Sequence, residues 1–311
     1  MKEILKWIAW VLFFVAVQRL VERQTMPKDE KYEASLQASL SKINEKSSTL
    51  FFLGSSRIMK SVNPNVLNDS LPDWETINFG MSGNSLAQNL YFAQFLSKMP
   101  GKKVLFIELT KFKSEMPISF TYTAKVLGFP DFPFSYYQYT YVNQDFKSKF
   151  EHTEKMFWDW ITKQQMGIKG LISGEIDQSY KIMGYTPVYE SNYPHHDSFI
   201  TRQDLVTYSK GKVDLEIWKR IEEIIKLQVK GHLKVVFLMP LNYKSKDELA
   251  LQIPIYSTLP SSLKWEYDDL FLKDIKKAKY LEDRNHLNYQ GSLIYSQGLV
   301  NYIKANEKNW Q

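Results

Sequence analysis

The sequence predicts an α/β fold in which helices cover both faces of a mainly parallel sheet. Four short runs are mainly apolar and lack the alternation of half-exposed strands, which is typical of strands buried on both faces. Segments with helical periodicity lie between or after these runs, and strands separated by helices favour parallel pairing. The expected strands are 49–53, 76–79, 103–109 and 234–239, and the expected helices are 85–98, 214–230 and 289–304.

Composition excludes several classes of protein and site. The chain has 311 residues, of which 44% are hydrophobic and 24% charged, as in ordinary globular proteins. It contains no cysteine, which excludes disulfides, thiolate nucleophiles and cysteine-ligated metals. The net charge of +6 is spread along the chain without a block of like charges, so we expect no nucleic-acid partner. We also expect neither a metal nor an organic cofactor.

The first residues predict a membrane anchor. Residues 4–21 are apolar apart from Gln18 and two charges near the ends of the run, Lys6 and Arg19. A helix of that length spans roughly 27 Å, close to the thickness of the hydrocarbon core. The run does not end in the small residues of a cleavable signal. We therefore expect a single-pass, uncleaved anchor over 1–25. A soluble amphipathic helix is the alternative, but apolar side chains would cover all its sides.

The rest of the chain divides into a short connecting helix and one large domain. Residues 26–48 have the periodicity of a stalk or packing helix, and 49–311 form the domain. An insertion at about 111–213 is rich in aromatic residues, Pro and Gly, and includes a helix-like segment at 146–163. We expect a lid or subdomain there. Its tyrosines suit either a sugar-stacking surface or an aromatic core, namely Tyr136, Tyr137, Tyr139 and Tyr141.

Three polar segments follow buried strands or precede the last helix. Ser55 and Ser56 follow the first strand, where a sharp turn can expose a nucleophile and its own N–H. The loop 78–85 after the second strand contains glycines that let backbone N–H groups approach negative charge. Asp283 stands three residues before His286, so it can orient the ring that takes a serine proton. Each segment alone also suits an ordinary turn or cap, but together they map to one edge of the sheet.

These motifs resemble the SGNH, or GDSL-type, hydrolase superfamily. The resemblance covers about Thr49 to Lys304 apart from the insertion, and it implies a three-layer α/β/α flavodoxin-like fold. It also implies that Ser56 is the nucleophile, that Asp283 and His286 complete the triad, and that Gly80 supplies an oxyanion N–H.

The motifs also resemble a narrower branch of that superfamily. The segments LGSSR, NFGMSGNS and DRNHLNYQG behind an N-terminal anchor are similar to membrane-attached proteins of bacterial cell-envelope acylation. Those proteins include the D-alanyl-lipoteichoic acid transfer protein and the alginate acetylation proteins. The resemblance implies a periplasmic or exterior domain, a cell-envelope glycan or lipid-linked acceptor, and a membrane-bound O-acyltransferase as partner.

The third block departs from the superfamily pattern. The usual oxyanion Asn after the third strand is missing, and the segment reads Ile107-Glu108-Leu109-Thr110. Losing one such donor costs about 2.7–4 kcal/mol of transition-state stabilisation. Asn84, Arg57 or Thr110 are the candidates to replace it. The departure favours a specialised acyltransferase or a non-catalytic relative over a broad esterase. We expect the acyltransferase first; the alternatives are an esterase with the same triad and a non-catalytic adaptor whose Ser56, Asp283 and His286 lie too far apart for hydrogen bonds.

Two other polar clusters predict ordinary surface. His195-His196-Asp197 lacks the spacing of metal ligands, so we expect a loop there. Lys246-Asp247-Glu248 has the composition of a solvated helix start.

Overall fold

The computed structural model describes most of the chain beyond residue 30. The described residues are 30–41, 43–113, 120, 123, 124, 126–128, 134–141, 184–189, 199–242 and 245–310, with Lys6 and Phe13. Among them, no helix has the length and apolar character needed to cross a membrane. The expected anchor over 1–25, the helix-like segment at 146–163 and the cluster at 195–197 lie outside the described residues, apart from Lys6 and Phe13.

The chain divides into two compact units. One comprises Met1–Glu30 and Tyr137–Lys181, and the other Lys31–Tyr136 and Ile182–Gln311. Almost all described residues belong to the second unit, so the fold below is that of the second unit.

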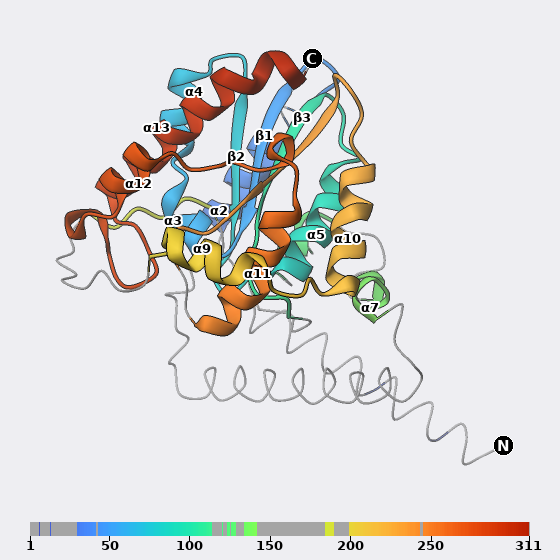
Figure 1. Cartoon of the computed structure of the whole chain (residues 1–311). Coiled ribbons are helices and arrows are strands. Elements are labelled where there is room, and N and C mark those ends of the chain that lie inside the picture. Colours follow the sequence, from blue (N-terminus) through green and yellow to red (C-terminus); the bar gives the residue numbers. More distant parts are fainter. Residues whose placement is uncertain are drawn as a thin grey trace. The chain divides into compact units, whose positions relative to one another are not determined.

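The sheet of this unit has four parallel strands in the order β2-β1-β3-β4 (Figure 1). The strands are β1 (Ser48–Gly54), β2 (Glu75–Gly80), β3 (Lys102–Glu108) and β4 (Leu233–Leu238), which confirms all four expected strands. Leu53 of β1 pairs with Phe79 on one side and with Ile107 on the other. The chain turns to one side after β1 and to the other after β3, so the switch point of the topology lies between these two strands.

Helices cover both faces of the sheet, giving three layers (Figure 1). On one face α3 (Ser56–Ser61), α4 (Pro64–Ser70) and α13 (Tyr289–Asn306) share a core with Leu50 and Phe52 of β1. On the other face α5 (Leu86–Leu96) contacts β1 and β3 and packs against α10 (Leu215–Lys226). Successive residues of β1 point to opposite faces and both are buried, which explains why this strand is apolar throughout.

The remaining helices are peripheral to the sheet. The α-helices are α2 (Glu30–Ser41), α7 (Phe134–Tyr141), α9 (Arg202–Ser209), α11 (Lys246–Thr258) and α12 (Asp269–Ile275). Three 3₁₀ turns cover Ser261–Leu263, Ala278–Tyr280 and Glu307–Trp310. The predicted helix in 26–48 is therefore confirmed over Glu30–Ser41.

The insertion contributes aromatic side chains to the core. Tyr136 of α7 is fully buried, with its ring 5.2 Å from that of Tyr91 and 4.7 Å from that of Phe120. The Tyr136 hydroxyl accepts a hydrogen bond from Gln88 at 2.8 Å. Of the two interpretations of the tyrosine run, Tyr136 fits the aromatic core.

Replacing Phe52 tests whether the core shared by β1, α3 and α13 carries the stability of this unit. Phe52 is fully buried and its ring stacks on that of Phe106 at 4.5 Å. We expect Phe52→Ala to lower the free energy of unfolding by about 3–5 kcal/mol, measured by urea denaturation. Val206→Ala, at a side chain that is 64% exposed, is the control and should change it by about 0.5 kcal/mol or less. Equal effects of the two substitutions would contradict this prediction.

Candidate active site

The turn that follows β1 presents a serine at the start of a helix. Ser55 is the N-cap of α3, and its hydroxyl accepts a hydrogen bond from the Arg57 N–H at 3.3 Å. Ser56 is therefore the first helical residue, and its N–H has no carbonyl within the helix to bond. The main chain here is held from β2, because the Met81 N–H donates to the Gly54 carbonyl at 3.0 Å.

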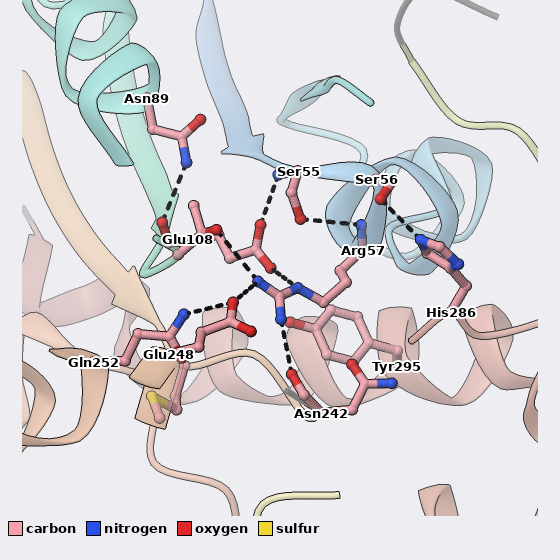
Figure 2. A network of polar contacts seen from close by, with 12 residues as sticks. Ser55, Ser56, Arg57, Asn89, Glu108, Asn242, Glu248, Gln252, His286 and Tyr295 are labelled. Atoms are coloured by element: carbon pink, nitrogen blue, oxygen red, sulfur yellow. Dashed lines mark hydrogen bonds and ion pairs between the residues drawn. The ribbon is translucent and has the colours of Figure 1, made fainter. Parts of the chain in front are cut away.

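Ser56, His286 and Asp283 form a continuous chain of hydrogen bonds. The Ser56 Oγ lies 2.8 Å from His286 Nε2 (Figure 2). The other ring nitrogen, Nδ1, lies 2.9 Å and 2.8 Å from the two carboxylate oxygens of Asp283. The structure thus brings together three residues that the sequence predicted to meet, although 230 positions separate Ser56 from His286.

The Asp283 carboxylate also shapes the turn that carries His286. Its Oδ1 accepts from the backbone N–H of Asn285 at 2.7 Å and of His286 at 3.0 Å. Burial raises the pKa of Asp283, but the hydrogen bonds from His286 and Asn285 and the charges of His286 and Lys60 outweigh it and lower the pKa to about 2. The carboxylate is therefore ionised near neutral pH and accepts the Nδ1 proton. That tautomer leaves Nε2 free to accept the Ser56 proton.

Gly80 is not placed as the expected oxyanion donor. Its N–H donates to the Asn78 side-chain oxygen at 2.8 Å. The Asn78 amide nitrogen in turn donates to the Ile58 and Val62 carbonyls at 3.1 and 2.7 Å, which fixes the end of α3 against β2. A Cβ at position 80 would lie 2.2 Å from the Met59 nitrogen, so glycine is needed for the close approach of α3. The expectation from the motif is corrected accordingly: the glycine here serves packing.

Asn84 and Arg57 also differ from expectation. The Asn84 amide nitrogen donates to Asn89 at 2.6 Å, and Asn89 donates to the Glu108 carbonyl at 3.2 Å. Arg57 is 5% exposed, and each of its three guanidinium nitrogens donates to a protein group. One of those groups is the hydroxyl of Thr110, the third suggested substitute, at 3.3 Å. All three Arg57 guanidinium nitrogens are therefore engaged, whereas the Thr110 hydroxyl accepts in this contact and keeps its own proton, and the Asn84 amide keeps a second N–H.

Arg57 forms a buried ion-pair network beneath the serine (Figure 2). Its Nε donates to Glu108 at 2.8 Å, and one terminal nitrogen donates to Glu248 at 2.6 Å. Both carboxylates are 1% exposed. Burial lowers the pKa of Arg57, but the two carboxylates outweigh it and raise the pKa above its ordinary value.

The network reaches the serine turn directly. The second oxygen of Glu108 accepts from the Ser55 N–H at 2.6 Å. The Glu108 carboxylate therefore bonds both neighbours of Ser56, namely the backbone of Ser55 and the side chain of Arg57. A Cβ at Gly54 would lie 2.8 Å from this oxygen, which requires a glycine there.

Sequence reasoning did not assign roles to these two carboxylates. Glu248 was expected on a solvated helix start; α11 does begin at Lys246, but the Glu248 side chain is buried. Glu108 ends an otherwise apolar strand, and a charged residue there had to be buried with a partner. That pattern could have directed attention to Arg57.

The described part of the insertion contacts the rim of the site. The Gly184 N–H donates to the Gly80 carbonyl at 3.2 Å, and the Thr186 N–H donates to Met59 at 3.2 Å. The Tyr189 ring lies 4.9 Å from that of Tyr289, the first residue of α13. Residues 184–189 therefore run beside α3 and the start of α13.

Comparisons with known proteins add no relative. No protein-family model, curated protein or solved structure matches this chain. Within the described part of the chain, no group of three or more His, Asp or Glu side chains is placed to hold a metal ion. The chemistry of the site is therefore inferred from the contacts above and from the motifs.

The lowered pKa of Asp283 predicts a loss of stability in acid. In the unfolded chain this carboxyl titrates near its ordinary value of 3.8, and in the folded protein at about 2. The ionised carboxylate therefore contributes fully to the free energy of unfolding above pH 3.8. This contribution is lost as the pH falls toward 2, because the unfolded state then binds more protons than the folded state. We expect the difference in unfolding free energy between wild type and Asp283→Asn to narrow as the pH falls from 3.8 toward 2. Urea denaturation repeated at a series of pH values measures this difference. A difference that does not change with pH would contradict the lowered pKa of Asp283.

Replacing Arg57 should destabilise the protein, because it leaves two buried carboxylates without their cation. Arg57→Met leaves Glu108 and Glu248 without their cation, and we expect a loss of about 3–5 kcal/mol in the free energy of unfolding. The matched control is Arg202→Met, whose ion pair with Asp269 is exposed at 76% and 64% and should contribute about 0–1 kcal/mol. Adding Glu108→Gln and Glu248→Gln to Arg57→Met should restore part of the loss. Urea denaturation of the three variants checks this, and equal losses for both arginines would refute it.

Proposed function

We propose that this protein is a membrane-anchored, extracytoplasmic SGNH-like O-acyltransferase. It modifies a cell-envelope polysaccharide or a lipid-linked acceptor through an acyl group carried on Ser56. The observation that carries the proposal is the chain of hydrogen bonds from Ser56 through His286 to Asp283. The proposed nucleophile Ser56 lies within hydrogen-bond distance of the proposed base His286, and His286 lies within hydrogen-bond distance of Asp283, as acyl transfer requires.

The first half of the reaction loads the serine. The Ser56 oxygen attacks the carbonyl carbon of the acyl donor while its proton passes to His286 Nε2. Asp283 stabilises the resulting imidazolium through the Nδ1 proton and stays ionised itself. The tetrahedral intermediate then collapses, its bond to the leaving group breaks, and His286 returns the proton to that group. The product is an acyl ester on Ser56.

The second half transfers the acyl group. A hydroxyl of the acceptor gives its proton to His286 Nε2 and attacks the ester carbonyl. The bond to the Ser56 oxygen breaks, and His286 returns the proton to the serine. Water in place of this hydroxyl would make the enzyme an esterase, so the acceptor decides between the two activities.

Stabilisation of the oxyanion has one clear donor. The Ser56 N–H at the start of α3 has no acceptor in its own helix, whereas Gly80, Asn84 and Arg57 donate elsewhere. Because each lost donor costs about 2.7–4 kcal/mol, this site is less suited to a broad esterase. An enzyme that receives an activated acyl group from a membrane-bound O-acyltransferase needs less stabilisation, and we propose such a partner.

The proposed location depends on the N-terminal segment and on the resemblance to envelope-acylation proteins. Residues 4–21 are apolar, with charges only at Lys6 and Arg19. An anchor there would hold the domain at the membrane surface beside its partner. The adaptor alternative predicts catalytic side chains beyond hydrogen-bond reach, and the 2.8 Å separation of Ser56 Oγ and His286 Nε2 speaks against it.

Adduct formation tests the nucleophile. After incubation with p-nitrophenyl acetate, we expect intact-mass spectrometry to find an acetyl group on wild type and none on Ser56→Ala, because the Ser56 hydroxyl lies 2.8 Å from the Nε2 of His286. Ser55→Ala is the matched control: it removes the neighbouring hydroxyl, which caps α3, and should still be acetylated. Equal labelling of wild type and Ser56→Ala would overturn the assignment. Adding a polysaccharide acceptor should then discharge the ester faster than water does.

A further inference from the structure

We propose that Asn242 is a positioning residue that ties the Asp283–His286 turn to the Ser56 turn through Arg57. The inference deepens the proposed function, since it concerns how nucleophile and base keep their separation. Asn242 follows β4 and is 3% exposed. It bonds one turn with its backbone and the other with its side chain.

The backbone of Asn242 is fixed to the nucleophile side. Its carbonyl accepts from a terminal nitrogen of Arg57 at 2.9 Å (Figure 2). Arg57 directly follows Ser56, and its guanidinium is held by Glu108 and Glu248. A planar guanidinium that bonds several groups has little freedom to reorient. The position of Asn242 relative to Ser56 is therefore fixed through the side chain of Arg57.

The side chain of Asn242 reaches the base side. Its amide nitrogen donates to the Arg284 carbonyl at 3.2 Å. Arg284 lies inside the turn, between Asp283 and the N–H groups that bond the Asp283 carboxylate. This single donor thus connects the segment after β4 to the turn that orients the His286 ring.

A second tie to the turn comes from a different element. Lys60 of α3 forms an ion pair with Glu282, the residue before Asp283. Asn242 and Lys60 therefore hold positions 284 and 282, on either side of the aspartate. These two attachments come from separate elements and add to the bond that closes the turn itself, from the Glu282 N–H to the His286 carbonyl at 2.9 Å. The 45% exposure of the Asp283 side chain shows that burial alone does not immobilise it.

The space between the two turns is small. Arg57, Asn242 and Asn285 line one cavity of about 10 Å³, close to the minimum that holds a single water. Asn242 therefore lies in a tightly packed region next to Arg57 and Asn285. Loss of the Asn242 donor would remove the direct tie across this contact.

The test compares variants that remove only the side-chain donor. Asn242→Leu keeps the number and branching of the side-chain heavy atoms, and Asn242→Asp is nearly isosteric; both keep the carbonyl that Arg57 bonds. We expect either to slow labelling of Ser56 by a fluorophosphonate probe by about tenfold or more, because a shift of about 1 Å can cost roughly 100-fold. With p-nitrophenyl acetate the loss should fall on kcat and leave KM nearly unchanged. Asn301→Leu, on the exposed side of α13, is the control.

A second readout does not depend on activity. The downfield proton resonance of His286 Nδ1–H should shift or broaden in both Asn242 variants and stay unchanged in Asn301→Leu. Thermal melts identify folded variants, and the Asp variant carries the test should the Leu variant fail to fold. Labelling at the wild-type rate with an unchanged resonance overturns the role of Asn242, whatever the stability. Absence of labelling in wild type overturns the proposed function instead, and the resonance then still decides whether Asn242 orients the ring.

Discussion

One guanidinium between two buried carboxylates is the constraint on which the site depends. Arg57 is adjacent to Ser56 in sequence, so any position that Glu108 and Glu248 impose on its side chain also limits the serine turn. A charge buried without a partner is strongly unfavourable, which keeps the three groups together. The ends of β1 and β3 and the start of α11 are thereby joined at the switch point of the sheet. These contacts fix the position of Ser56.

The fold was predictable because its signal is local. Each strand is a short, mainly apolar segment, and each main helix starts at a polar cap, such as Ser85 before α5 and Asp214 before α10. The order β2-β1-β3-β4 comes from the structure, since hydrophobic patterns do not state which strands are neighbours. The SGNH assignment and the anchor remain predictions.

The site was predictable in part. Ser56, Asp283 and His286 carry a recognisable pattern, and the structure places them in contact. Glu248 carries none, because it looks like an ordinary charged residue at a helix start and its partner lies 191 positions away. The position of Glu108 at the end of a buried strand indicates a buried partner but does not identify Arg57, which lies 51 positions away. For Gly80, by contrast, the motif predicted a functional role that the structure does not support. The motif suggests a ligand-facing N–H, but the close approach of Met59 and the Asn78 side chain account for the glycine. The catalytic roles themselves stay predictions.

The separation of nucleophile and base along the chain has a consequence for biosynthesis. Ser56 emerges from the ribosome 230 residues before His286, a delay of about 10–50 s at ordinary elongation rates. Throughout that interval the serine has no base, and the α13 segment that completes its surroundings does not yet exist. In the proposed mechanism, a growing polypeptide therefore carries Ser56 without the base that activates it. The Ser56–His286 pair can form only after residue 286 has been added.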